Sequence, residues 1–439
     1  MAINKYCATL FILFALELNC FGFVDKYNTF ILGIGFYDLI FLLRIFIVFI
    51  TILLNPGIFQ NRKICLNILP IGAVILLLTG TIAAYLSVGQ PFIYGLASQR
   101  EWISCILMYY PLRIWIQKGK LNFNKIVKTL LVASSIYIVI CIIQYLLVDS
   151  VIFMSFSSLN ERYGTARLSL DTLFPIIISA FCVDGVISNN TTKSKKVYFG
   201  LVLAGALFVV AVITKGRMAT VSLAAGIIIC LLIRRENIKI KIVCIALVGV
   251  ALIVLFTSQI GQDVLDILFG SSTGISADTM TIREVEREYY LELLSDSFSR
   301  ILIGWGYPSA SWEPAVMVGT PTFGDWTYYP TDIGVIGHLF NYGILGIIWC
   351  FIIYIKFFIN SFKIYKFTGR TSFLQIIIVN LISSVTLYLI LFTNTIIFVL
   401  MYALLENMVE RIKNAAIPNL GEVSAKTNLL RCKYINAIS

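Results

Sequence analysis

Long apolar stretches separated by short polar connections make up most of the chain. Runs of about twenty apolar residues recur along it, which is the length that an α-helix needs to cross the hydrocarbon core of a bilayer. The pattern predicts an all-α, polytopic integral membrane protein, with residues 1–439 forming a single transmembrane domain. Twelve spans are predicted, at 6–24, 30–54, 64–86, 92–116, 125–147, 169–187, 197–214, 217–233, 241–256, 334–357, 373–391 and 394–411.

One polar segment interrupts this pattern between the predicted ninth and tenth spans. Residues 257–332 contain eleven carboxylates, three arginines and no lysine. An acidic insertion of this length in a basic membrane protein predicts a large loop on the side of the membrane opposite the basic loops. Within it, residues 279–296 predict an amphipathic helix. Four apolar residues recur there at helical spacing, namely Ile282, Val285, Tyr289 and Leu293.

The positions of lysine and arginine orient the spans, because basic loops stay in the cytoplasm. Alternate loops carry most of the basic residues, which places both termini inside and the large loop outside. The basic residues of the inner loops are Arg62, Lys63, Lys118, Lys120, Lys193, Lys195, Lys196, Arg234, Arg235, Lys239, Lys363, Lys366 and Arg370. The net charge of +11 follows from this topology, so no nucleic-acid partner is predicted.

The cysteine and histidine content limits which disulfides, metal sites and cofactors the sequence predicts. The chain has ten cysteines but none in the large loop, a single histidine, and no CxxC pair. A disulfide framework in the loop and a metal site built from histidine or cysteine are therefore not predicted. The sequence also contains no Walker A loop and no dinucleotide fingerprint, so no cofactor is predicted.

Eight basic residues remain on the predicted outer face. They are Lys26, Arg162, Arg167, Lys215, Arg217, Arg283, Arg287 and Arg300. Six of the eight are arginine, the side chain best suited to bidentate binding of phosphate or pyrophosphate. This composition predicts an anionic ligand on the outer face.

Each of these cations also has a structural interpretation. Lys215 and Arg217 flank Gly216 at the start of a span, where they either extend to the membrane surface or clamp a phosphate at a helix N-terminus. Arg162 and Arg167 precede the sixth span and either bind the ligand or pair with Glu161. Arg283 and Arg287 lie four residues apart on the predicted loop helix, where Glu284 and Glu286 are able to neutralise them.

Asp332 and His338 are the candidate bases beside these arginines, since a base needs only reach and a suitable pKa. Asp332 is also a natural N-cap for the tenth span, and a lone histidine at a helix start is also typical of a structural residue. Five charged residues inside predicted spans should face the bundle interior, where they pair or line a cavity. They are Glu17, Asp38, Arg44, Arg100 and Glu101.

Three local motifs accompany this topology. They are Ile213-Thr214-Lys215-Gly216-Arg217-Met218-Ala219, then Arg283 and Tyr289 followed by Ile303-Gly304-Trp305-Gly306, and Asp332 followed by Asn341-Tyr342-Gly343-Ile344-Leu345-Gly346. Together with the order of the spans, they resemble the O-antigen polymerase and O-antigen ligase family of bacterial inner-membrane proteins. The family's ligase-type histidine position falls on Asp332, and the serine of its Ser-Arg-Gly pattern is missing, which favours a polymerase.

The resemblance implies a glycosyltransferase that moves a glycan from undecaprenyl pyrophosphate to a sugar hydroxyl of the next lipid-linked repeat unit. The reaction would take place at the periplasmic face of the inner membrane, without nucleotide or metal. The implied partners are the undecaprenyl-pyrophosphate-linked oligosaccharide, membrane lipid, and a chain-length regulator and flippase of the same pathway. The product would be O-antigen, capsule or exopolysaccharide.

The resemblance also implies roles for individual residues. Arg217 and Arg283 would stabilise the pyrophosphate leaving group, and Asp332 or His338 would act as the base. The residues expected to bind pyrophosphate or glycan are Arg162, Arg167, Lys215, Arg287, Trp305 and Tyr328. Three alternatives remain open, namely a ligase with lipid A core as acceptor, a flippase for lipid-linked sugars, and a scaffold without catalysis.

Overall fold

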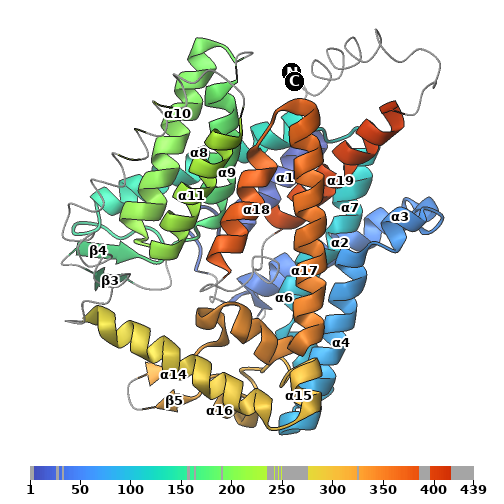
Figure 1. Cartoon of the computed structure of the whole chain (residues 1–439), viewed down its shortest axis with the longest axis vertical. Coiled ribbons are helices and arrows are strands. Elements are labelled where there is room, and N and C mark those ends of the chain that lie inside the picture. The colour runs from blue at the N-terminus through green and yellow to red at the C-terminus, as the bar shows by residue number, and fades with distance from the viewer. Residues whose placement is uncertain are drawn as a thin grey trace.

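The computed structural model describes residues 4–25, 29–31, 34–155, 159–162, 165–188, 191–234, 275–323, 326–384 and 396–416, with single positions at 242, 246 and 249. Most of these residues are helical, as predicted (Figure 1). The helices of the first half are α1 (Lys5–Glu17), α2 (Phe36–Leu53), α3 (Arg62–Cys65), α4 (Ile68–Val88), α5 (Phe92–Ser98), α6 (Arg100–Leu107), α7 (Tyr109–Gln117), α8 (Phe123–Leu146), α9 (Leu173–Ile187), α10 (Lys193–Phe208) and α11 (Arg217–Ile233). Those of the second half are α14 (Ile275–Ser295), α15 (Phe298–Ile303), α16 (Glu313–Gly319), α17 (Val335–Thr368), α18 (Ser372–Ser383) and α19 (Ile397–Ala416).

Short elements connect these helices. The two-stranded antiparallel hairpins are β1–β2 (Thr29–Ile31, Ile34–Gly35), β3–β4 (Leu159–Arg162, Thr165–Leu168) and β5–β6 (Thr322–Phe323, Trp326–Thr327). The short helical turns are η1 (Pro56–Phe59) and η3 (Pro330–Ile333), both 3₁₀, and η2 (Val209–Ile213), a π-helical turn. The hairpins were not predicted, because none has a long alternating pattern.

Apolar helices identify the protein as embedded in a membrane. Among the described residues, five helices are long and apolar enough to cross one, namely Phe36–Leu53, Arg62–Val88, Phe123–Leu146, Lys193–Ile213 and Val335–Thr368. Shorter apolar helices are Leu173–Ile187, Met218–Ile233 and Ser372–Ser383. The number of twelve spans stays a prediction, and most of the ninth, at 241–256, lies outside the described residues.

Three predicted spans differ most from the helices found, and in the second the helix begins only at Phe36, after the β1–β2 hairpin. The first is shorter, because α1 ends at Glu17, and the fourth is divided into α5, α6 and α7. At the first break, the buried Gln99 side chain donates hydrogen bonds to the carbonyls of Leu77 (3.3 Å) and Gly95 (3.0 Å). It also accepts one from the Tyr342 hydroxyl at 2.9 Å. The break is thus tied to α4 and to α17.

The sequence left open whether the charges inside the helices pair or line a cavity, and the structure shows that Arg44 and Arg100 are paired. Arg44 lies 2.7 Å from Glu17, with side chains only 4% and 2% exposed. Arg100 lies 2.7 Å from Asp38. Glu17 also accepts hydrogen bonds from the backbone N–H of Ile396, at 3.0 and 2.9 Å. Because an unpaired charge is costly in a low-dielectric interior, these pairs fix how α1, α2, α6 and α19 face one another.

The second half of the large polar segment folds onto one end of the bundle, where α14 lies across the ends of the helices instead of parallel to them (Figure 1). The Gln90 side chain, beyond the end of α4, donates to the Tyr307 carbonyl (3.1 Å) and accepts from the Ser309 N–H (2.8 Å). The indole N–H of Trp312 donates to the Val88 carbonyl at 3.1 Å. These bonds attach the loop between α15 and α16 to the α4–α5 turn. A separate apolar cluster joins α14, this loop, η3 and α17, and consists of Tyr290, Leu294, Trp305, Ile333 and Phe340.

Three glycines allow this end of the bundle to close. Gly304, Gly306 and Gly343 all have positive φ, of 81°, 97° and 62°. A Cβ on Gly343 would lie 2.4 Å from the Leu302 carbonyl, and one on Gly304 would lie 2.7 Å from the Gly343 nitrogen. A Cβ on Gly306 would lie 2.1 Å from the Ala84 nitrogen. Two of the sequence motifs, at 303–306 and 341–346, therefore meet through backbone contact that only glycine permits.

Replacing Gly306 by Ala should destabilise the protein more than replacing Gly89. Both glycines have positive φ, but a Cβ on Gly89 meets nothing within 4 Å. Gly89→Ala should therefore cost only the conformational strain, about 1–2 kcal/mol. Gly306→Ala adds a backbone overlap of about 1–3 kcal/mol. Thermal unfolding of both variants in detergent measures this difference in stability. Equal melting temperatures would contradict the close contact between Gly306 and the Ala84 backbone.

Candidate functional site

A cationic corner, defined as Arg167, Lys215 and Arg217, lies where α10 turns into α11. The Nε–H of Arg167, from strand β4, donates a hydrogen bond to the Thr214 carbonyl at 3.0 Å. This bond brings the outer loop before α9 against the turn that begins α11. Two of the sequence-predicted groups of cations are thus brought together by the fold.

The local backbone explains how the corner is shaped. Helix α10 ends in the π-helical turn η2, in which the Thr214 N–H donates to the Val209 carbonyl at 2.9 Å. Lys215 then adopts a positive φ of 48°, unusual for a residue with a side chain, and is only 4% exposed. Arg217 is the first residue of α11, where free backbone N–H groups favour an anion. π-Helical turns occur often at functional sites.

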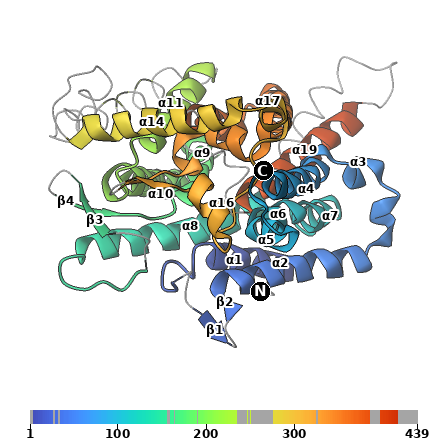
Figure 2. The same ribbon diagram turned by 90° about the horizontal axis from the view of Figure 1, so that it is seen from below.

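The remaining predicted arginines lie on β3, α14 and α15. Arg162 is in β3, paired in register with Thr165, and its side chain and that of Arg217 lie outside the described part of the structure. Arg283 and Arg287 are half-buried on α14. In Figures 1 and 2 alike, the β3–β4 hairpin lies beside the first turns of α14. Arg300 is on α15, which Figure 1 shows at the other end of α14, so the predicted outer cations do not all lie at this corner.

Helix α14 forms as predicted, but it packs on a different face. Val285 is 42% exposed, whereas Tyr290 is fully buried and Glu286 and Leu294 are each 3% exposed. The buried stripe therefore runs through Glu286, Tyr290 and Leu294, four residues apart at each step. The apolar periodicity missed this face because a carboxylate occupies one of its positions.

Glu286 is a carboxylate held in an unfavourable setting. Within the described residues its Oε2 atom has no hydrogen-bond partner. The pKa of Glu286 is raised to about 7, mainly by burial and also by the negative charge of Asp332. The backbone N–H of Tyr329 and the Arg283 guanidinium act in the opposite direction. A carboxylate with its pKa near neutrality is suited to accept or donate a proton.

Asp332 faces solvent beside this carboxylate. It lies in the 3₁₀ turn η3, with its N–H donating to the Tyr329 carbonyl at 3.0 Å. The prediction that Asp332 caps the tenth span is wrong, because Gly334 holds the N-cap position of α17 with a φ of 58° and no side-chain bond. Its carboxylate is therefore not used by the helix and remains exposed.

His338 is placed away from this surface. Its side chain is completely buried in α17. Nε2 lies 3.5 Å from the Cys350 sulfur, and the ring lies 5.1 Å from that of Tyr342. A Cβ on Gly346 would come within 2.9 Å of Nε2, so the imidazole packs against that glycine. These contacts fit the structural interpretation of His338 better than that of a base.

The aromatic residues divide into packed and exposed groups. Trp305 is 9% exposed, donates from its indole N–H to the Leu293 carbonyl at 2.8 Å, and lies under the Arg300 guanidinium at 4.2 Å. Tyr328 is half-buried, with its ring 5.0 Å from that of Phe323. The rings open to a ligand in this region are those of Phe323, Trp326 and Tyr329, at 51%, 55% and 47% exposure. Trp305 therefore serves packing, and Trp326 and Tyr329 are better placed for a sugar.

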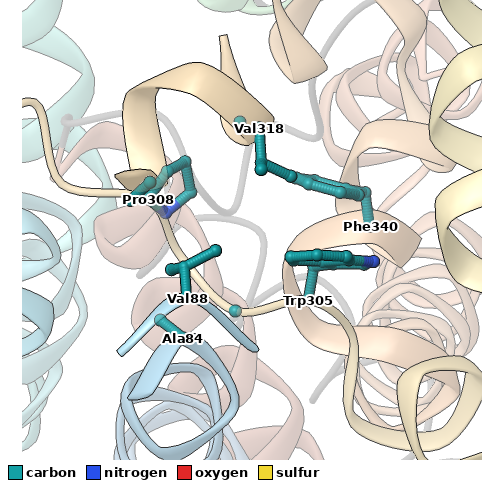
Figure 3. A pocket seen from close by; sticks show the side chains of 9 residues that line it. Ala84, Val88, Trp305, Pro308, Val318 and Phe340 are labelled. Carbon is teal, nitrogen blue, oxygen red and sulfur yellow. The ribbon is translucent and has the colours of Figure 1, made fainter. Parts of the chain in front are cut away.

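A small cavity lies between α4 and the polar segment (Figure 3). Its lining is apolar, with Trp305 and Phe340 on one side and Ala84 and Val88 on the other. Its volume is about 10 Å³, close to the minimum for one water molecule. The cavity is a packing defect beside Trp305 and is too small to bind a sugar.

Among the described residues, no three His, Cys, Asp or Glu side chains gather in a way that could hold a metal ion. Comparison of the chain with protein-family models and with curated protein sequences finds no match. The structure supports a helical protein embedded in a membrane. The resemblance to the polymerase and ligase family stays a prediction.

Replacing Glu286 by Gln should stabilise the protein at alkaline pH. The folded-state pKa of about 7 lies above the ordinary 4.5, so ionisation opposes folding, and stability falls as the pH rises between these values. Glu286→Gln removes up to about 3 kcal/mol of this penalty, at 1.36 kcal/mol per pKa unit. Its melting temperature should exceed that of the wild type at about pH 8, and the difference should shrink by about pH 5.

Glu288→Gln provides the matched control, since Glu288 is an exposed carboxylate on the same helix. It should change the melting temperature little at either pH. If the wild type were as stable as Glu286→Gln at the higher pH, the buried Glu286 carboxylate would not destabilise the folded protein.

Proposed function

We propose that the protein is a bacterial surface-polysaccharide polymerase. It transfers a glycan from undecaprenyl pyrophosphate to a sugar hydroxyl of the next lipid-linked repeat unit, at the periplasmic face of the inner membrane. The cytoplasmic end of the bundle is then the one where Lys63 lies 3.4 Å from Glu410. The proposal includes a flippase that supplies the donor and a chain-length regulator that ends synthesis.

The hydrogen bond from Arg167 to Thr214 is the observation that carries the proposal. It holds a guanidinium beside the turn that contains Lys215 and the N-terminus of α11, so two cations and a helix N-terminus gather at one place. This combination suits a pyrophosphate, which accepts several charge-assisted hydrogen bonds at once. Arg283 and Arg287 lie on α14, the first turns of which lie beside the β3–β4 hairpin (Figure 1).

The chemistry follows from where charge develops. As the bond between the sugar carbon and the pyrophosphate oxygen lengthens, negative charge grows on the leaving group. Cations fixed by the backbone stabilise that charge more strongly than they stabilise the bound donor, which lowers the barrier. The lipid of the donor remains in the bilayer, and the apolar helices place the cationic corner at its edge.

Lysine in place of Arg167, Arg217 or Arg283 should abolish polymer formation without preventing membrane insertion. Lysine keeps the charge but loses the planar pair of donors, and losing one such contact lowers turnover by about 10²–10³-fold. A gel of surface polysaccharide from the deletion strain carrying each variant gives the readout, with an immunoblot for membrane level. Arg62→Lys is the control, because Arg62 is exposed beside Lys63. If all three variants gave the full series of polymer bands on the gel, the proposed binding of pyrophosphate by these arginines would be wrong.

The same gel separates the proposal from its alternatives when the parent, the deletion and the complemented strain are compared. A polymerase is supported if the deletion leaves a single repeat unit on the surface lipid. Polymer that stays on the undecaprenyl carrier and is absent from lipid A would indicate a ligase instead. Lipid-linked repeats that accumulate on the cytoplasmic side would indicate a flippase.

A further inference from the structure

The buried face of α14 carries a carboxylate where an apolar residue would pack at lower cost. Glu286 lies one helical turn before Tyr290, whose ring is 4.7 Å from that of Phe340. Within the described residues, no ion pair to Glu286 is formed and its Oε2 lacks a hydrogen-bond partner. Buried polar groups are usually satisfied, so a nearly buried acceptor with an empty position indicates a role outside packing.

The surroundings of Glu286 place it directly beneath the surface. Its neighbours on and beside η3, Asp332 and Tyr329, are both exposed. The charged and titratable groups facing it are Arg283 and Tyr290 from α14, and Asp332 from η3. Arg300 of α15 is instead bound to Asp296 and stacked on Trp305.

We propose that Glu286 is the catalytic base that takes the proton of the acceptor sugar hydroxyl, and that Asp332 is a positioning residue beside it. This assignment rests on the proposed transfer reaction. Oε2 offers the free acceptor position, and Arg283, one of the cations proposed to bind the pyrophosphate, lies one turn before Glu286 on the same helix. The exposed rings of Trp326 and Tyr329 provide flat apolar surface for the acceptor sugar close by.

The step balances without a further reactant. The acceptor hydroxyl oxygen attacks the anomeric carbon of the donor sugar, and the bond from that carbon to the pyrophosphate oxygen breaks. The bonding electrons remain on undecaprenyl pyrophosphate, and the hydroxyl proton passes to the Glu286 carboxylate. Glu286 later releases the proton to water. A carboxylate made more basic by burial and by the Asp332 charge removes this proton more readily than an ordinary one.

Glu286→Gln should reduce polymerisation at least about 100-fold, because the amide keeps the shape but accepts no proton. Membranes from strains carrying each variant are assayed with lipid-linked repeat units extracted from the deletion strain. Glu288→Gln, the exposed neighbour on α14, should keep the wild-type rate. Glu286→Asp should recover part of the activity, which a purely structural role for Glu286 would not require.

The pH profile gives the sharper readout. The wild-type rate should rise with pH through about 7 as Glu286 ionises. Asp332→Asn removes the negative charge that raises the pKa of Glu286, so the midpoint of its profile should move to lower pH. A profile that Asp332→Asn leaves unmoved would overturn the positioning role.

The outcomes distinguish this inference from the proposed function. If wild-type membranes form no polymer, the transfer reaction itself is wrong. If they do, and Glu286→Gln polymerises as fast as Glu288→Gln, only the assignment of the base fails. Loss of activity in Glu286→Gln alone, with protein present at wild-type level, supports it.

Discussion

The backbone contact between the loop after α15 and the kinked start of α17 determines how the outer part of the protein is held. Gly304 and Gly343 approach so closely that neither tolerates a Cβ. Trp305 is the next residue after Gly304, and its backbone N–H donates a hydrogen bond to the Phe340 carbonyl at 2.7 Å. This contact places Phe340 and Ile333 under α14 and so creates the small apolar cluster. The burial of Glu286 depends on that cluster.

Inside the bundle, the governing constraint is electrostatic. Charged groups are retained where their partners come from other helices, as with Arg44 and Glu17, or Lys356 and Glu406 at 2.6 Å. Breaking the buried Arg44–Glu17 pair leaves an uncompensated charge at a cost of about 3–5 kcal/mol, whereas Lys356 is 38% exposed and its pair contributes less. Each pair therefore favours one arrangement of the helices over arrangements that separate the partners.

The sequence predicted the class of fold and that Arg44 would face the bundle interior, because a charge in an apolar run has few options, but it left open whether Arg44 and Arg100 pair or line a cavity. It also predicted the loop helix at 279–296. The sequence did not predict which face of that helix is buried. The prediction used the spacing of apolar residues, and the buried face includes the carboxylate of Glu286. The packing of Trp305 and the bond from Arg167 to Thr214 depend on residues far apart in sequence, and no local pattern encodes them.

Asp184 at the end of α9 has a mechanical consequence. Its carboxylate lies 3.0 Å from Arg234 at the end of α11 and accepts the N–H groups of Thr371 and Ser372, which begin α18. At their other ends, α9 and α11 are linked through Arg167 and Thr214. Polar contacts therefore connect the two helices, or the residues that flank them, at both ends. Relative sliding of α9 and α11 is therefore resisted, so Arg167 would keep its position against the turn that begins α11 when the surrounding lipid moves.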